Sequence, residues 1–353
     1  KKQNMKKRNL SAKKKIHNFF LKKLKNPKIK KIYLEFKKNI DLQNSKKLCI
    51  AISGGPDSMS LAFLAKYYSI QKKTKFFYCI VDHKLRSEST KEAKITKERL
   101  KKFDINCEIL TWKNKNVFSN IQSKARDKRY ELIFNRCSKK NINFVVTAHQ
   151  KDDLFENFFI RLLRGSGLKG LSSFNNIKTK IIKEKDIHVL RPLLNICKKD
   201  LIYIAKNTFN FFIKDPSNNN DYFLRIKIRK LIKKLNNEGL SFNKLKISLD
   251  NLHQSNQVIE FYVKKNIENN SKFLNDKKSV IINQKFFKQP NEIVFRSFSA
   301  LIHSIGKKNK FSRGSKVLNL IKSINSLKNF KKMTLSGCII EKVNKSIIIS
   351  REN

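Results

Sequence analysis

Short apolar runs alternate with amphipathic helical patterns along the first half of the chain. The apolar runs are Leu48–Ile52, Phe76–Val81, Cys107–Thr111 and Phe144–Thr147, and the helical patterns between them cover 58–68, 88–103 and 119–139. Strands that alternate with helices of this length form βαβ units, whose parallel sheet is covered by helices on both faces. The pattern therefore predicts an α/β fold with a doubly wound, mostly parallel sheet.

The pattern changes on both sides of this α/β region. A basic segment with helical periodicity precedes it, and a Lys- and Asn-rich helical region follows it. The last two β-rich runs flank Asn344-Lys345, which is typical of a hairpin. We therefore expect a basic N-terminal arm or helix, an α/β domain, and a smaller C-terminal region of helices and a β-hairpin. Their expected bounds are 1–45, 46–235 and 236–353.

A glycine turn, SGGPDS (53–58), stands between the first apolar run and the helical pattern after it. A strand that enters a helix through such a turn gathers backbone N–H groups and a helix N-terminus, which together bind phosphate. Gly54, Gly55 and Pro56 shape the turn, Ser53 and Ser58 add hydroxyl groups, and Asp57 is suited to phosphate-bound Mg²⁺. The segment is not a Walker loop, because no GK[ST] follows. The alternative is a plain βα turn with Asp57 as the helix N-cap.

A second polar cluster, TAHQKDDLFEN (147–157), also begins at the end of a predicted strand. His149, Asp152, Asp153 and Glu156 form an acidic group that suits a metal ion or an ammonium group. The alternative is a capping box, since acidic residues near a helix N-terminus favour the helix dipole. The apolar side chains of this helix are expected to pack on the sheet.

Two further segments carry candidate phosphate ligands. In VDHKLRS (81–87), His83 and Arg86 are placed to bind a phosphate or a leaving pyrophosphate, although a single His at a strand end is more often structural. In RLLRGSGLKGL (161–171), Arg161 and Arg164 lie beside a glycine-rich loop, which equally suits a simple helix C-cap. The carboxyl ends of parallel strands share one edge, so we expect the clusters at 53–58, 82–83 and 148–149 to line one crevice.

Charge and cysteine content limit the possible functions. The net charge of +53 favours a nucleic-acid partner, but Lys, Asn and Ile are abundant everywhere, which weakens that argument. Arginine is more selective: 14 of the 80 basic residues are Arg, and ten of them lie between Arg86 and Arg229. The six cysteines form no CxxC pair, so we expect no structural zinc or iron–sulfur cluster and a reducing cytoplasm. No apolar run is long enough to cross a membrane.

The hexapeptide at 53–58 resembles the PP-loop of the N-type ATP pyrophosphatases. Taken in order, SGGPDS, DHKLR, AHQKDD with its Glu, RLLRGSGLKGL, RPLL and DPSN…R…IR resemble the tRNA(Ile)-lysidine synthetase family. The resemblance covers about residues 46–230, and a weaker one continues to FSRGSKV and TLSGCIIE near the end. Asn157 and Gln150 depart from the family pattern, in which Thr and His are usual.

This resemblance implies an adenine nucleotide alpha hydrolase-like fold and a two-step ligation. ATP adenylates C2 of the wobble cytidine in the CAU anticodon of tRNA(Ile), and the ε-amine of L-lysine then displaces AMP. It implies ATP and Mg²⁺ as ligands, with the PP-loop on ATP and Asp57 on the metal. The catalytic residues would be Asp57, Asp152, Asp153, Glu156 and Arg86, with Glu156 assigned to lysine. The substrate-binding residues would be His83, His149, Arg161, Arg164, Arg191, Arg225 and Arg229.

Three alternatives remain open at this point. A tRNA 2-thiolation enzyme uses the same scaffold, but it needs active-site cysteines, often as CxxC. A GMP-synthetase-like ligase would more often carry an amidotransferase and a less basic surface. A basic RNA-binding protein with an inactive nucleotide fold would bind tRNA without turning over ATP, and Asp57→Ala would not affect it.

Overall fold

The computed structural model divides the chain into two compact units, Lys1–Leu245 and Lys246–Asn353, which are described separately. The part of the chain that the structure describes is 14–72, 74–112, 121–173, 177–182, 185–213, 224–274, 278–307, 312–326, 330 and 332–352. The DPSN motif of the family resemblance, at 215–218, lies outside these residues.

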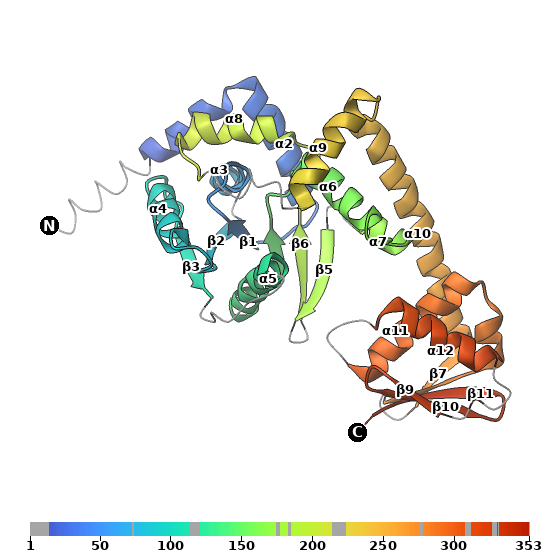
Figure 1. Ribbon diagram of the computed structural model, residues 1–353. Coiled ribbons are helices and arrows are strands. Elements are labelled where there is room, and N and C mark those ends of the chain that lie inside the picture. Colours follow the sequence, from blue (N-terminus) through green and yellow to red (C-terminus); the bar gives the residue numbers. More distant parts are fainter. Residues whose placement is uncertain are drawn as a thin grey trace. The chain divides into compact units, whose positions relative to one another are not determined.

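The first unit contains a six-stranded sheet with strand order β3-β2-β1-β4-β6-β5 (Figure 1). Five of the strands are parallel, as the sequence predicts, and β5 is antiparallel to β6. The antiparallel strand was not anticipated. Of the strand-like run Ile187–Leu194, only the part up to Leu190 belongs to a strand. The strands are β1 (Lys47–Ile52), β2 (Lys75–Asp82), β3 (Cys107–Thr111), β4 (Phe144–Val146), β5 (Ile177–Ile182) and β6 (Lys185–Leu190).

Alternate residues of the central strands enter two different cores. Leu48 and Ile50 of β1 belong to one apolar cluster, and Cys49 between them belongs to another. Helices α3, α4 and α8 lie on one face of the sheet and α5 on the other (Figure 1). Since both faces are covered, the doubly wound prediction is confirmed. These helices are α3 (Pro56–Gln71), α4 (Ser89–Lys101), α5 (Ile121–Lys139) and α8 (Lys198–Phe209).

The basic N-terminal segment contributes to this core. Helix α2 (Pro27–Asp41) begins after Asn26, whose side chain accepts hydrogen bonds from the N–H groups of Lys28 and Ile29. Its residues Ile29 and Phe36 are buried in the same apolar cluster as β1. Helix α2 therefore belongs to the compact α/β unit.

Helix α6 (Lys151–Leu162) packs mainly against another helix, α9 (Leu224–Asn237). Leu154 and Phe155 are buried, whereas Leu162 and Leu163 are 49% and 62% exposed. The prediction that its apolar stripe packs on the sheet is therefore wrong. The short helix α7 (Leu168–Leu171) follows it.

The second unit is a five-stranded antiparallel sheet, in the order β7-β8-β11-β10-β9, packed against helix α11 (Asn291–Gly306). The predicted terminal hairpin is confirmed, because β10 and β11 pair up to Val343 opposite Ser346. The remaining elements are α10 (Phe242–Asn270), which begins in the first unit, β7 (Ser271–Leu274), β8 (Ser279–Ile282), η3 (Gln284–Lys288), α12 (Gly314–Ser326), β9 (Lys332–Leu335), β10 (Cys338–Val343) and β11 (Ser346–Arg351).

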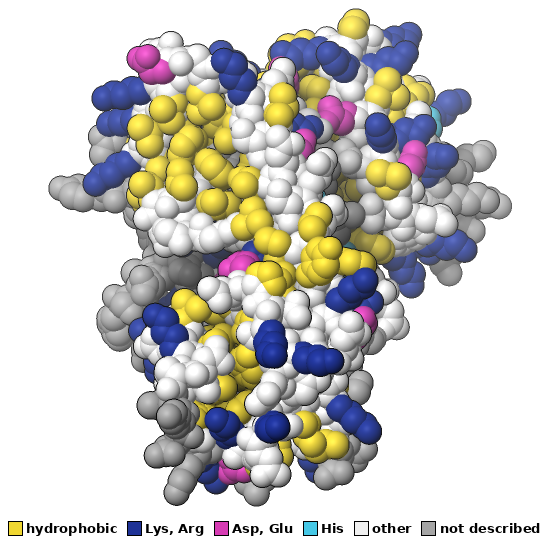
Figure 2. All heavy atoms as spheres, turned by 90° about the vertical axis from the view of Figure 1, so that its right-hand side faces the viewer, with side chains coloured by type: hydrophobic (Ala, Val, Ile, Leu, Met, Phe, Trp, Pro, Cys, Tyr) yellow, Lys and Arg dark blue, Asp and Glu magenta, His cyan; other side chains and the backbone are white. Residues whose placement is uncertain are grey.

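The face drawn in Figure 2 shows no single basic stripe among the described residues. Figure 2 shows Lys and Arg side chains spread over the visible face, between apolar and neutral areas. This distribution agrees with a composition that is Lys-rich throughout. Among the described helices, none combines the length and apolarity that crossing a bilayer requires.

Candidate active site

The candidate site lies where the chain reverses its direction across the sheet. Strand β1 has β2 on one side and β4 on the other. The chain runs from β1 through β2 to β3 on one side, and then crosses back to β4 on the other side. Such a switch point opens a crevice at the carboxyl ends of the strands. A cleft of about 380 Å³ lies there, lined by the loop after β1, by His83 after β2 and by His149 after β4. The predicted convergence of the three clusters is confirmed.

The loop at 53–58 is held by a compact hydrogen-bond network. Ser58 Oγ accepts from the Ser53 N–H and hydroxyl at 3.1 Å each and donates to the Gly55 carbonyl at 3.0 Å. Gly54 has φ +83°, and a Cβ there would lie 2.8 Å from Thr96 Oγ1 and 2.9 Å from Ile213 Cδ1. Glycine is required at this position for both conformation and space.

Helix α3 starts two residues earlier than its periodicity indicates, with Gly55 as N-cap and Pro56 in its first turn. Asp57 is therefore not the N-cap and makes no capping hydrogen bond. Proline is favoured at this position because the first N–H groups of a helix have no partner within it. The free N–H groups of the first turn, the hydroxyls and the helix dipole together favour an anion such as phosphate.

Asp57 is a half-buried carboxylate of the cleft lining. Its Oδ1 is inaccessible to solvent and has no hydrogen-bond partner among the described residues. Burial, and next the nearby Asp153, raise the pKa of Asp57 from 3.8 to about 7. An orphaned carboxylate oxygen beside a phosphate-binding loop fits a divalent cation, which takes oxygen ligands and shares them with phosphates.

The start of α6 contains a capping box, but not the one that the sequence indicates. Gln150 Oε1 accepts from the Asp152 N–H at 2.9 Å, and Asp153 Oδ2 accepts from the Gln150 N–H at 2.9 Å. Asp153 also lines the cleft, and burial raises its pKa. Asp152 is exposed and is not part of the lining. Asp153 thus has both a capping contact and a position in the site.

Glu156 is not part of the cleft lining and forms an ion pair with α9. It is 1% exposed, and Arg229 Nε donates to its Oε1 at 2.5 Å. Arg225 Nε lies 3.9 Å from its Oε2, and Arg225 lines the cleft. Burial raises the pKa of Glu156 more than Arg229 lowers it. In this structure Glu156 fixes the helix that carries both arginines.

The loop after β2 is organised by Asp82, which the sequence placed in the crevice together with His83 but which is absent from the cleft lining. Its carboxylate accepts from the Lys84 N–H and from the hydroxyls of Ser89 and Thr90 at 2.7–3.0 Å. Arg86, predicted to bind phosphate, lines the cleft and pairs with Glu92 at 2.9 Å. The carboxylate of Asp82 therefore fixes the backbone that presents Arg86 to the cleft.

Among the described residues, only one of the two ring nitrogens of His83 has a hydrogen-bond partner. Arg129 Nε donates to His83 Nε2 at 3.1 Å, and His83 Nδ1 is buried without a partner among the described residues. Burial, and next Arg129, lower the pKa of His83 from 6.5 to about 4. A neutral imidazole whose Nε2 accepts a hydrogen bond carries its proton on Nδ1, so it is available to donate to a ligand.

Four arginines lie at the cleft, and we call them the arginine wall: Arg126, Arg129, Arg191 and Arg225. The sequence motifs did not indicate Arg126 and Arg129. Arg126 and Arg129 of α5 line the cleft together with Arg225. Arg191 is buried and hydrogen-bonded with Tyr130, another lining residue. Burial, and next these four arginines, hold the pKa of His149 well below its usual value. The concentration of Arg between residues 86 and 229 was the available signal, since an arginine-lined cavity suits phosphate groups.

The two arginines predicted at 161–171 have different environments. Arg161 Nη1 donates to the Gly170 carbonyl at 2.6 Å, and its Nε donates to Asn157 Oδ1 at 2.6 Å. It therefore closes the glycine loop onto α6. Arg164 is exposed, and neither residue lines the cleft.

The described residues contain no group of His, Cys, Asp and Glu able to hold a metal ion on their own. No cysteine lines the cleft, and five of the six cysteines are buried. A cation at Asp57 would thus need ligands from a bound phosphate or from water.

Comparison with known proteins agrees with this site. A family profile described as a PP-loop domain matches residues 24–235. The tRNA(Ile)-lysidine synthase of Orientia tsutsugamushi (strain Boryong) is 35% identical over 324 residues, which cover 88% of this chain and 70% of that protein. The chain belongs to the tRNA(Ile)-lysidine synthase family. Another tRNA(Ile)-lysidine synthase, from Rickettsia typhi (strain ATCC VR-144 / Wilmington), is 33% identical and covers 87% of this chain.

This lysidine synthase family member also shares its fold with a solved structure of another function. The U34-tRNA thiolase NcsA from Methanococcus maripaludis aligns with a TM-score of 0.55 at 16% identity, covering 64% of this chain and 79% of that one. At this identity the likeness concerns the fold alone. It confirms the nucleotide hydrolase-like sheet, whereas the lysidine synthase assignment depends on the sequence relatives.

Proposed function

We propose that this chain ligates L-lysine to C2 of the wobble cytidine in the CAU anticodon of tRNA(Ile). In the first step the C2 oxygen attacks the α-phosphate of ATP and pyrophosphate leaves. In the second step the lysine ε-amine attacks C2 and AMP leaves with the oxygen. The observation that carries the proposal is a single cleft, found in a member of the lysidine synthase family. This cleft brings together the PP-loop, the unpartnered Asp57 Oδ1, Asp153 and the arginine wall.

The PP-loop forms the ATP half of the proposed site. The N–H groups at the start of α3 and the hydroxyls of Ser53 and Ser58 would hold the phosphates. Asp57 Oδ1 would bind Mg²⁺, which when bound neutralises phosphate charge and favours departure of pyrophosphate. Arg86 and His83, which line the same cleft, would donate hydrogen bonds to the phosphates.

Asp153 is our candidate for the general base on the lysine ε-amine. A lysine ammonium with a pKa of about 10.4 costs about 4–5 kcal/mol to deprotonate at neutral pH. Two features of the cleft reduce this cost. The arginine wall disfavours a second cation, and the raised pKa of Asp153 makes it a stronger base than an ordinary Asp.

Lysine recognition would involve α9. Glu156, expected to bind lysine, is paired with Arg229, so we assign it the positioning of Arg229 and Arg225. These guanidinium groups are suited to the lysine carboxylate or to RNA phosphate. Asp152, exposed beside the cleft, is the remaining carboxylate for the α-ammonium group.

We assign the tRNA contacts to exposed basic residues around the cleft and to the C-terminal unit. Arg164 and the lysines of α9 are exposed on the first unit. Lysine and arginine near an RNA backbone supply sequence-independent affinity. A tRNA substrate also places the reaction in the cytoplasm.

The thiolation alternative is disfavoured by chemistry as well as by the relatives. A thiolase must bind sulfur at the site, and no cysteine lines this cleft in the described structure. The inactive RNA-binding alternative does not account for the family membership together with the intact loop and Asp57.

The test is to incubate the protein with ATP, radiolabelled lysine and unmodified tRNA(Ile) bearing CAU, with tRNA(Met) as the control. We expect one AMP and one pyrophosphate for each lysine that becomes bound to tRNA(Ile), and no label on tRNA(Met). Absence of label from both tRNAs with folded, ATP-binding protein would refute the proposal. Label on both would refute only the discrimination between them.

A further inference from the structure

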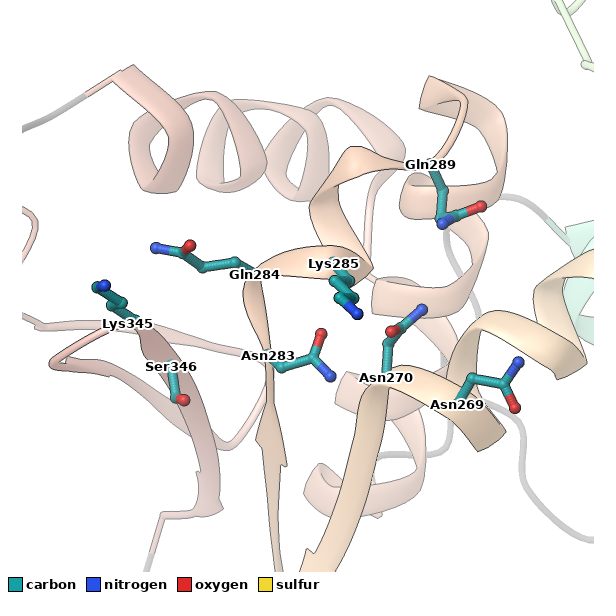
Figure 3. Close-up of a pocket in the computed structure, with 8 residues that line it drawn as sticks. All are labelled: Asn269, Asn270, Asn283, Gln284, Lys285, Gln289, Lys345 and Ser346. Carbon is teal, nitrogen blue, oxygen red and sulfur yellow. The ribbon is translucent and has the colours of Figure 1, made fainter.

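A second cavity, of about 640 Å³, lies entirely within the C-terminal unit and shares no lining residue with the cleft (Figure 3). Three separate segments of chain form it. Asn269 and Asn270 come from the end of α10, the residues from Asn283 onward follow β8, and Lys345 comes from the β10–β11 turn. We call it the amide pocket, defined by Asn269, Asn270, Asn283, Gln284, Lys285 and Lys345.

The chemistry of the amide pocket is uniform. Its polar lining consists of side-chain amides, two lysines and a serine, and no carboxylate lines it. In Figure 3 the side chains of Asn270, Asn283 and Lys285 point toward one another, and Gln284 extends toward Lys345. Side-chain amides offer a donor and an acceptor together, which matches the edges of nucleobases. Lysine supplies the point charge that binds phosphate.

The floor of the pocket is held in place by hydrogen bonds. The Asn283 N–H donates to the Asn270 carbonyl at 3.1 Å, and Asn283 Oδ1 accepts from the Phe286 N–H at 3.2 Å. Asn270 Nδ2 donates to Asn266 Oδ1 at 2.9 Å, and Asn266 is itself buried. These contacts fix the backbone on two sides of the pocket before any ligand arrives.

The two lysines are available to a ligand. Lys285 and Lys345 are exposed, and within the described residues neither makes an ion pair or a hydrogen bond. Lys345 is carried by a tight turn in which Asn344 has φ +52°. Lys345 therefore joins the pocket lining from the hairpin, and Lys285 joins it from η3.

We propose that the amide pocket binds one unpaired nucleotide of the RNA substrate, with Lys285 and Lys345 on its phosphate and the amides on its base. An unpaired nucleotide is the fitting ligand, because the major groove of an RNA duplex is too narrow for side chains, whereas an unpaired base can turn outward and present its whole edge to a pocket. That the ligand is an RNA rests on the proposed function. Binding at the amide pocket does not depend on the ligation chemistry.

The test measures binding of the full chain to two fluorescent RNAs by anisotropy, without ATP or lysine. One probe is a blunt-ended RNA duplex, and the other is the same duplex with a short unpaired 3′ extension. The variant Lys285→Ala/Lys345→Ala removes the pocket cations. The matched control is Lys288→Ala/Lys342→Ala, which removes two exposed lysines from the same η3 helix and the same hairpin outside the pocket.

We expect the wild-type protein to prefer the extended probe. The pocket variant should lose roughly tenfold in affinity for that probe and reduce the salt dependence by about one phosphate contact. The control should lose clearly less. Asn269→Ala/Gln284→Ala, which removes exposed amides without protein hydrogen bonds among the described residues, should abolish the preference between probes at unchanged salt dependence.

Equal losses in the two lysine variants, or no preference for the extended probe, would overturn the inference. Circular dichroism would check that each variant is folded. Failure of the proposed function looks different: the wild-type protein would add no lysine to tRNA while the pocket variants still lost RNA affinity. Conversely, normal lysine transfer with unaltered RNA affinity in every variant would refute the pocket alone.

Discussion

Replacing Asp57 by Asn should make the ligand-free protein more stable at alkaline pH, at the expense of metal binding. Asp57 Oδ1 is buried without a partner, and burial raises its pKa from 3.8 to about 7. Ionisation of Asp57 therefore destabilises the ligand-free fold, and in the proposed function a bound cation would offset this cost. Removal of the charge by a nearly isosteric amide should remove that cost.

The sign and size follow from proton linkage. A carboxyl group with a raised pKa binds its proton more tightly in the folded chain, so its favourable contribution is complete below pH 3.8 and is lost as the pH rises to about 7. A difference of about 3 pH units corresponds to about 4 kcal/mol. Between pH 5 and pH 8 the wild type should lose about 2–3 kcal/mol relative to Asp57→Asn.

The assay is urea unfolding of both proteins across this pH range with EDTA and without nucleotide. The control is Asp186→Asn, the same chemical change at an exposed carboxylate of β6. Asp57→Asn should resemble the wild type near pH 5 and exceed it at pH 8, whereas the control should follow the wild type throughout. Adding Mg²⁺ and ATP should stabilise the wild type but not Asp57→Asn, since only a ligand bound to the folded state shifts the equilibrium.

A stability difference that does not change with pH would show that Asp57 is not a strained charge. Greater stability of the wild type at pH 8 would have the same meaning. Unchanged stabilisation of Asp57→Asn by Mg²⁺ and ATP would refute the assignment of Asp57 to the metal.

Three further predictions follow from the site. In thermal unfolding, Gly54→Ala should destabilise the protein by about 1–3 kcal/mol, and it should also abolish ATP binding. The control is Gly167→Ala, because Gly167 has φ −69° and open space around its Cα. The control should change stability by less than about 0.5 kcal/mol. Glu156→Gln should lower the free energy of unfolding by about 3 kcal/mol, because it leaves Arg229 without its partner. The double variant Glu156→Gln/Arg229→Gln should recover a large part of this loss. A rise in the lysine KM at unchanged stability would instead assign Glu156 to lysine binding. His83, with its pKa lowered to about 4, stays neutral at physiological pH, and its stability contribution is lost only as the pH falls from 6.5 through 4; a proton NMR titration midpoint near 6.5 would contradict this.

Most of the first unit could be predicted from local patterns. Alternation within Leu48–Ile52 assigns residues to the two faces of the sheet, and the predicted order of strands and helices is observed. Strand β5 could not be foreseen, because an antiparallel strand at a sheet edge depends on its partner β6 more than on its own sequence. The partner of α6 was mistaken for the same reason: a stripe of apolar residues shows that a face is buried, not what covers it.

The site was predictable where residues follow strand ends and less so elsewhere. The loop at 53–58, His83 and His149 meet as expected because parallel topology places strand ends together. The pairing of Glu156 with Arg229 joins residues 73 positions apart, which no local spacing encodes. Arg126 and Arg129 lie in the middle of a helix, where a basic residue is usually solvated, so only the concentration of Arg pointed to them.

The most direct test of the central claim is nucleoside mass spectrometry of tRNA(Ile) after reaction with ATP and lysine. The account predicts that the wobble cytidine gains one lysine with loss of one water, in an amount equal to the AMP formed. An unmodified cytidine despite ATP cleavage, or a nucleoside that contains sulfur in its place, would contradict it.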